Sequence, residues 1–253
     1  MLEQFTAHLT PFGKDRVVRV WLPDEIETPG TGYPVMYMFD GHNLFRDEWA
    51  TYGTCWGLAD FLARWEKPMI VVAPECDREG NNRLIEYSPY DPMELPPYGT
   101  FHGRGAEYMD WLLGELKPWV DSHYPTIPFR ETTGVGGSSM GGLMSLFAVL
   151  RYNRWFSKAA CLSSSLRFCY PRLLQEAETA ALDRDTRVYL SWGSAECQTK
   201  VSLANATDLN LTMSRTLTRR GVNTYPYLHV GGAHCEADWA VEVPGFMDYL
   251  WRE

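Results

Sequence analysis

The sequence predicts an α/β protein with a mostly parallel central sheet and helices on both of its faces. Strand signals alternate with helix signals along the 253 residues, which is the pattern of repeated βαβ units. Several strand segments are nearly continuous apolar runs, as expected of strands that are covered on both faces. No repeat, low-complexity tract or linker interrupts the alternation. We therefore expect a single domain over residues 1–253.

Six segments carry strand signals, in addition to the one that leads into a glycine-rich turn. The first alternates polar and apolar residues, which is typical of a half-exposed strand, and the others are mainly apolar. The six segments are Arg16–Leu22, Pro34–Phe39, Met69–Ala73, Ala159–Ser163, Arg187–Trp192 and Thr224–Val230. The short segment before the turn is Glu131–Gly136.

Helical periodicity lies between the strand segments. Glu107–Val120 places apolar residues three and four apart, and Ala204–Arg220 has an apolar stripe opposite a polar face. A closing helix is expected from Pro244 to Trp251. Arg167–Asp185 has room for one short helix, so no large lid is expected there.

One connection is much longer than the others. Glu75–His102 follows the strand segment Met69–Ala73, and prolines at positions 89, 92, 96 and 97 interrupt regular structure in it. Loops beyond about 15 residues are uncommon in compact domains and are often functional. This one leaves the carboxyl end of a parallel strand, where open α/β sheets bind their ligands. We therefore expect it to form a wall of a substrate pocket.

Charge and composition argue against several kinds of partner. The chain has 23 Lys and Arg against 32 Asp and Glu, a formal net charge of −9, which disfavours a nucleic-acid surface. No apolar run is long enough to span a membrane, and the first residues lack a signal-peptide pattern, so a cytoplasmic location is expected. The six cysteines are scattered without a C-x-x-C pair, which predicts free thiols. Neither a metal site nor a cofactor is expected.

The glycine-rich turn is the most informative stretch. Gly137–Gly141 has the sequence GSSMG, which matches G-x-S-x-G, and it precedes the apolar helical segment Gly142–Leu150. Small residues on both sides let the backbone turn sharply and present Ser139 in a strained conformation. Ser138 does not fit the pattern, which would then need glycine at position 140. The context favours a nucleophile elbow with Ser139 as nucleophile over an ordinary glycine-rich turn.

A serine nucleophile needs a base, and the base needs a third group that orients it. On such an elbow the order along the chain is serine, acid, histidine. Of the six histidines only His229 and His234 follow Ser139. His229 lies inside an apolar strand segment, where a structural histidine is more common. His234 lies in the loop directly after it, so His234 is the predicted base and His229 the alternative.

The acid is expected just after the preceding strand. Glu196 lies shortly beyond Arg187–Trp192, whereas Asp185 precedes that strand and belongs to the wrong end of the sheet. Glu236 is too close in sequence to the predicted base to orient it, although it could touch substrate. Glu196 is therefore the predicted acid.

An acyl-transfer site also needs N–H donors for the negatively charged oxygen of the tetrahedral intermediate. One donor is expected from the backbone of Met140, directly after the nucleophile. The other is expected in the loop Phe39–Phe45, where Gly41 permits a turn that aims the backbone N–H of His42 inward. The imidazole of His42 is expected to form a wall.

Together these segments resemble the "putative esterase" family of α/β-hydrolases, over roughly residues 16 to 250. That family includes enterochelin-type siderophore esterases, feruloyl and acetyl-xylan esterases, S-formylglutathione hydrolases and mycolyltransferases. The matching stretches are Tyr37–Phe45, Arg83–Pro89, Gly137–Gly142, Gly193–Glu196 and Gly232–Trp239. The resemblance implies an α/β-hydrolase fold, Ser139 as nucleophile, Glu196 as acid, His234 as base and an oxyanion amide at His42. Cys235 and His42 replace the family's usual asparagine and glutamine.

The expected activity is that of a metal-free serine carboxylesterase acting on a small-molecule ester. Short acyl or aryl-acyl esters, including those on sugars, are favoured because aromatic residues follow the strands and no large lid is expected. The alternatives are a siderophore-lactone esterase, an S-formylglutathione-type thioesterase, an acyltransferase and a catalytically silent binding protein. Substrate contacts are expected from Asn43, Arg83, Glu86, Tyr87, Trp192 and Trp239. No nucleic-acid or membrane partner is expected, and the sequence is compatible with a homodimer.

Overall fold

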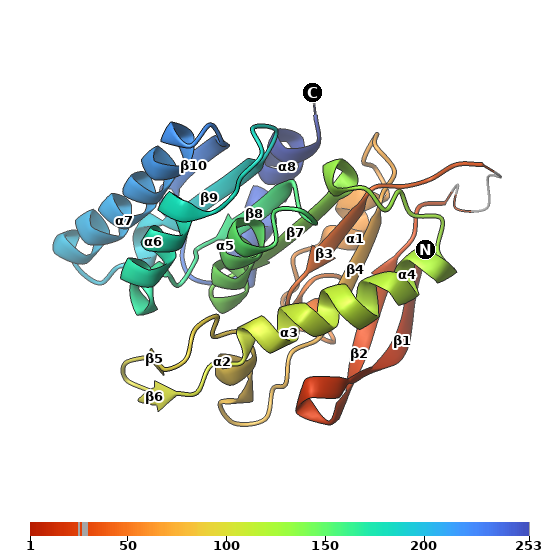
Figure 1. The fold of residues 1–253 in the computed structure, drawn as a ribbon, viewed down its shortest axis with the longest axis horizontal. Coiled ribbons are helices and arrows are strands. Elements are labelled where there is room, and N and C mark those ends of the chain that lie inside the picture. Colours follow the sequence, from red (N-terminus) through yellow and green to blue (C-terminus); the bar gives the residue numbers. More distant parts are fainter. Residues whose placement is uncertain (25, 27–29, 253) are drawn as a thin grey trace.

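The computed structural model describes residues 1–24, 26 and 30–252, and its main feature is an eight-stranded sheet (Figure 1). On one side β1 (Leu2–Leu9) pairs antiparallel with β2 (Lys14–Trp21), and β2 pairs antiparallel with β4 (Ile70–Pro74). The remaining neighbours are parallel, in the order β4, β3 (Val35–Met38), β7 (Thr133–Ser138), β8 (Lys158–Leu162), β9 (Arg187–Gly193) and β10 (Asn223–His229). The predicted fold class is confirmed. The carboxyl ends of the parallel strands lie together at one end of the sheet, and β10 is the edge strand on the side opposite β1.

Two hydrophobic layers cover the sheet because alternate residues of its central strands point to opposite faces. In β3, Val35 and Tyr37 pack in one layer, and Met36 and Met38 pack in the other. The first layer contains α3 (Gly105–Trp111), α4 (Lys117–His123), α5 (Met140–Arg151), α6 (Tyr170–Thr179) and α7 (Lys200–Arg219). The second contains α1 (Leu58–Leu62) and α8 (Glu236–Trp251), which lie behind the sheet in Figure 1.

The helices match the sequence patterns except at their ends. A π-helical turn, Leu112–Leu116, joins α3 to α4, so the predicted helix is present and slightly longer. The expected start of the last helix at Pro244 is wrong, because α8 begins at Glu236 and contains this proline. Trp239, Val243 and Phe246 follow helical spacing and are all buried in the second layer. This packing outweighs the local cost of proline.

Several short elements that tertiary contacts stabilise were not predicted from the sequence. The long connection contains α2 (Asn82–Glu86) and a small hairpin of β5 (Met93–Glu94) and β6 (Thr100–Phe101), so it is not irregular throughout. Hydrogen bonds from the amides of Arg104 and Gly105 to carbonyls of residues 85 and 88 tie the start of α3 to the region of α2. The edge strand β1 was also missed.

Other expectations concern the region between β8 and β9, the cysteines and the membrane. Between β8 and β9 the structure has a short 3-10 turn, Leu166–Phe168, and only one α-helix, α6, as predicted. All six cysteines are free, also as predicted. Among the described residues, no helix combines the length and the apolar character that a membrane span requires.

Candidate active site

Ser139 lies at a sharp turn between β7 and α5, as the motif predicts. Its backbone has φ 56° and ψ −119°, a conformation that costs free energy and is often found at functional sites. Close packing enforces the turn: a Cβ on Gly142 would lie 2.7 Å from the Leu162 carbonyl oxygen, and the Ser139 amide donates to the same oxygen at 2.9 Å. The serine therefore stands at the carboxyl end of the sheet, beside the N-terminus of α5.

Two hydrogen bonds in series connect Ser139, His234 and Glu196. His234 follows β10, and its Nε2 lies 2.9 Å from Ser139 Oγ. Its Nδ1 lies 2.8 Å from Oε2 of Glu196, in the 3-10 turn that follows β9. A carboxylate accepts the Nδ1 proton, so Nε2 is left free to accept the serine proton. The structure thus brings together three groups that lie far apart in the sequence.

Glu196 is held by more than its histidine partner. Its Oε1 accepts hydrogen bonds from Ser163 Oγ at 2.6 Å and from the Gly193 amide at 2.7 Å. Burial by itself raises the pKa of Glu196, but these bonds and the one from His234 together hold the pKa below its ordinary value. The carboxylate is therefore ionised at neutral pH.

Ser163 and Ser165 are site residues that the sequence interpretation missed. Ser163 has φ 44°, and its Oγ accepts a hydrogen bond from Nε1 of Trp239 at 2.8 Å while it donates to Glu196. The Trp239 ring also meets the His234 ring edge-on, with centroids 5.0 Å apart. Ser165 Oγ lies 3.4 Å from Ser139 Oγ. The available signal was the run of three serines directly after β8.

The expected oxyanion loop follows β3, the strand beside β7. Gly41 lies so close to the end of β4 that a Cβ would be 2.0 Å from the Ala73 carbonyl oxygen. His42, next in the same 3-10 turn, is buried, and its Nε2 bonds to Thr51 Oγ1 at 3.0 Å. Burial lowers the pKa of His42, although Asp40 and Glu75 oppose this effect. A neutral imidazole held by Thr51 fits a structural role.

Arg83 and the buried Asp40 form a partly buried ion pair beside this loop. Nε and Nη2 of Arg83 each lie 2.8 Å from one carboxylate oxygen of Asp40. Burial alone raises the pKa of Asp40, but the Arg83 charge and its hydrogen bonds lower it overall. Ligand atoms of Asp40, His42 and Cys76 also lie within 4.8 Å of one another. Because Arg83 already binds both carboxylate oxygens, this cluster is poorly suited to a cation.

Two predicted substrate contacts are wrong. The side chain of Glu86 pairs with Arg16 and accepts the Asp77 amide, and the residue is only 1% exposed. Tyr87 is 0% exposed and packs edge-on against Phe39. The sequence places both in the long connection, but α2 turns their side chains into the core, where a substrate cannot reach them.

The other predicted contacts have protein partners. Asn43 Nδ2 donates to Glu236 Oε1 at 3.0 Å, and its Oδ1 accepts the Thr51 amide at 2.9 Å. Trp192 is buried and donates to Thr207, and Trp239 is buried against His234. Arg83 keeps 28% of its side chain exposed. Direct contact between these residues and an ester stays a prediction.

Comparisons with known proteins agree with this geometry. The family model described as "Putative esterase" matches residues 10–248. The uncharacterized protein YbbA of Bacillus subtilis (strain 168) is 28% identical over 191 residues, which cover 75% of this chain and 72% of that protein. An esterase of Mycobacterium tuberculosis (strain ATCC 25618 / H37Rv) is 31% identical over 152 residues, 59% of this chain and only 30% of the longer protein.

Solved structures are similar over nearly the whole chain. A ferulic acid esterase has a TM-score of 0.75 at 18% identity, covering 100% of this chain and 98% of its own. The enterobactin and salmochelin hydrolase IroE has a TM-score of 0.73 at 20% identity, covering 99% and 95%. The siderophore hydrolase EstA from Aspergillus nidulans has a TM-score of 0.76 at 17% identity, covering 98% and 95%. At these identities the likeness shows the fold alone, whereas the family model spans residues 10–248: the chain belongs to the "putative esterase" family and is a hydrolase with an α/β fold.

Proposed function

We propose that the protein is a serine carboxylesterase in which Ser139 is the nucleophile, His234 the general base and Glu196 the orienting acid. The observation that supports this proposal is the hydrogen-bond series from Glu196 through His234 to Ser139, at 2.8 and 2.9 Å. These are the contacts that convert a weakly nucleophilic hydroxyl into a reactive one. Membership of an esterase family supports an ester as the bond that is cleaved.

The reaction then has two halves. Ser139 Oγ attacks the ester carbonyl while His234 Nε2 accepts its proton, and the oxygen of the tetrahedral intermediate is held by the backbone N–H groups of Met140 and His42. The N-terminus of α5 favours the same negative charge. His234 next donates its proton to the departing alcohol, which leaves an acyl group on Ser139. Water, activated by the same imidazole, releases the acid and regenerates the enzyme.

Replacing Glu196 by glutamine should lower kcat/KM by about 10²- to 10⁴-fold, less than the loss of the nucleophile itself. A neutral amide oxygen still accepts the Nδ1 proton of His234 but does not stabilise the imidazolium. Steady-state kinetics on a p-nitrophenyl ester measures the effect. Asp185→Asn is the matched control, because Asp185 binds Arg130 at the amino end of β9 and should be dispensable. Loss of activity in Asp185→Asn, with Glu196→Gln fully active, would overturn the choice of acid.

The pH profile of kcat/KM should rise through one ionisation, the loss of a proton from His234. An imidazolium cannot accept the serine proton, so the base must be neutral for the first step. Glu196, whose pKa lies below its ordinary value, is already charged at neutral pH and adds no second ionisation there. Initial rates at low substrate concentration measure the profile. A rising part of the profile whose slope corresponds to the loss of two protons would contradict this assignment.

The surroundings of Ser139 favour compact, polar esters. The groups described near it are largely polar: Ser165, the Arg83–Asp40 pair and the Asn43–Glu236 pair. Most aromatic residues expected to line the pocket are instead buried, so stacking on them contributes less than the sequence suggested. With a single short helix between β8 and β9 there is no large lid to cover a long alkyl chain.

We therefore expect kcat/KM to be highest for short acyl or aryl-acyl esters. Across p-nitrophenyl esters from acetate to palmitate, the short chains should exceed palmitate by about tenfold or more. Methyl ferulate and an acetylated xylo-oligosaccharide extend the comparison, and added alcohols reveal any acyl transfer to a second acceptor. A maximum at palmitate would contradict the proposed substrate class.

A siderophore lactone is the second candidate substrate. Among the similar structures, EstA is named a siderophore hydrolase and IroE an enterobactin and salmochelin hydrolase. Arg83, charged and partly exposed beside the oxyanion loop, would suit the polar groups of such a ligand. Hydrolysis of a siderophore lactone, with feruloyl and acetyl-sugar esters both inert, would favour this candidate over the first.

A further inference from the structure

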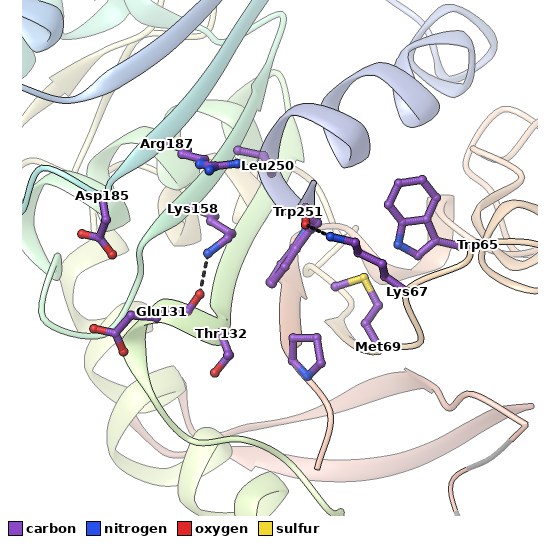
Figure 2. A pocket seen from close by; sticks show the side chains of 11 residues that line it. Trp65, Lys67, Met69, Glu131, Thr132, Lys158, Asp185, Arg187, Leu250 and Trp251 are labelled. Carbon is purple, nitrogen blue, oxygen red and sulfur yellow. Dashed lines mark hydrogen bonds between the residues drawn. The ribbon is translucent and has the colours of Figure 1, made fainter. Parts of the chain in front are cut away.

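A pocket lies at the amino end of the sheet, opposite the end that carries Ser139. Its volume is about 270 Å³, and residues at or just before the starts of β3, β4, β7, β8 and β9 line it together with the last turn of α8. Figure 2 shows Lys158 and Lys67 approaching it on either side of Trp251. The pocket is separate from the proposed esterase site, and nothing in that chemistry uses it.

Three cations that line this pocket have no carboxylate partner among the residues that the structure describes. Lys67 Nζ donates to the Trp251 carbonyl at 2.9 Å, Arg187 Nη1 donates to the Arg252 carbonyl at 2.6 Å, and Lys158 donates to the Glu131 carbonyl. Within the described part of the chain, none of the three lies within 4.0 Å of a carboxylate oxygen. Carbonyl oxygens satisfy these hydrogen bonds but carry no full negative charge, so none of the three cations is directly paired with a carboxylate of the described residues.

The acidic residues of the pocket do not cancel this charge. Asp185 is bound by Arg130, with Nη1 lying 2.7 Å from each carboxylate oxygen, and the Glu131 side chain is exposed. Burial, with a smaller contribution from Arg187, lowers the pKa of Lys158 to about 8. Arg130 also lowers the pKa of Lys158, whereas Asp185 and Glu131 raise it. Burial and the neighbouring guanidinium groups thus outweigh the attraction of these two carboxylates for the Lys158 ammonium.

The rest of the wall is flat and apolar. The Trp251 ring lies against β7 so closely that a Cβ on Gly134 would be 2.9 Å from it, and Lys158 Nζ lies 5.0 Å from the ring centroid. Trp65 faces the same pocket, and Met69 and Leu250 are buried beside it. Among the described residues neither Trp65 nor Trp251 has an acceptor for its indole N–H, but both N–H groups are buried and closed to a ligand. The wall therefore offers apolar rings beside the three cations.

We propose that this pocket binds a small carboxylate on a flat apolar body, of the arene carboxylate class. The carboxylate lies between Lys158 and Arg187, where it compensates their charge, and the ring packs against the tryptophan side. A carboxylate suits the pocket better than a neutral ring, because Lys67, Lys158 and Arg187 all line it. This site acts independently of the ester chemistry.

The test is calorimetric titration of the protein with sodium benzoate. Wild type should bind with a Kd on the order of 1 mM, and Lys158→Met should bind at least about tenfold more weakly. Lys158→Arg keeps the charge and should retain binding. Lys200→Met, which removes one charge at the exposed start of α7, is the matched control and should also retain it. Benzamide, with the same ring and no charge, should bind at least about tenfold more weakly than benzoate.

A second measurement keeps the test decisive if Lys158→Met does not fold. In wild type with ¹³C-methylated lysines, the Lys158 signal, identified by its absence in Lys158→Arg, should shift on adding benzoate, and its pKa should rise from about 8. No saturable binding below about 10 mM would overturn the proposal and leave the cations with only a structural role at the end of α8. If folded Lys158→Met binds benzoate as well as wild type does, and benzoate competitively inhibits ester hydrolysis, then benzoate binds at Ser139. That result would also overturn the proposal.

Discussion

Ser139→Ala should lower kcat/KM by about 10⁴-fold or more, the largest effect expected from any single replacement in this protein. Alanine keeps the Cβ and the backbone of the turn between β7 and α5. It removes only the Oγ atom that lies 2.9 Å from His234 Nε2. The variant should therefore fold like wild type, which thermal unfolding followed by circular dichroism checks, while steady-state kinetics measures the loss.

Ser165→Ala is a close control for this prediction. Its hydroxyl lies 3.4 Å from that of Ser139, so it is a rival nucleophile at the same site, and the replacement removes the same atom. A fluorophosphonate probe should label wild type and Ser165→Ala but not Ser139→Ala. Activity of Ser139→Ala within about tenfold of wild type would disprove the assignment of the nucleophile.

His234→Ala should be about as damaging as the loss of Ser139, and the double variant should be little worse than either single one. Without the imidazole the serine proton has no acceptor, and Glu196 loses the group that it orients. The same kinetic assay measures all three variants. Non-additivity is the specific result to expect from groups that act as one unit.

His229→Ala is the control for the choice of base. His229 Nδ1 lies 3.3 Å from Oε1 of Glu242, its side chain is 15% exposed, and Glu242 also accepts a hydrogen bond from Tyr189. Removing His229 should therefore lower stability, since the buried Glu242 loses a partner, while much of the activity is retained. The reverse pattern, with His229 essential and His234 dispensable, would contradict the proposed mechanism.

The sequence predicted the parts of the molecule that follow from local pattern. Continuous apolar runs identified the central strands because both faces of these strands are covered. The G-x-S-x-G turn and the chain order of acid and histidine then led to Ser139, Glu196 and His234, which the structure brings into contact. Glycines at the turns identified these positions, because a tight turn or a close approach between backbone segments often requires glycine.

What the sequence did not predict depends on how elements pack. Glu86 and Tyr87 seemed available in a loop, but a helix of one turn and a half decides which way they point, and only its contacts with the core set that direction. Ser163 has no motif of its own and becomes important because β8 ends beside Glu196. The start of α8 was hidden by Pro244, whose unfavourable local effect is overcome by burial of the helix.

The position of β10 bears on how the enzyme fails when heated. This strand pairs only with β9, at the side of the sheet, and most of its residues are at least partly exposed. Outer elements open with lower free energy than the core, without unfolding of the rest. Opening of β10 would carry the segment with His234 away from Ser139 while the central strands stay paired. We therefore expect inactivation on mild heating to precede melting of the sheet, so that the loss of activity follows the detachment of this one strand.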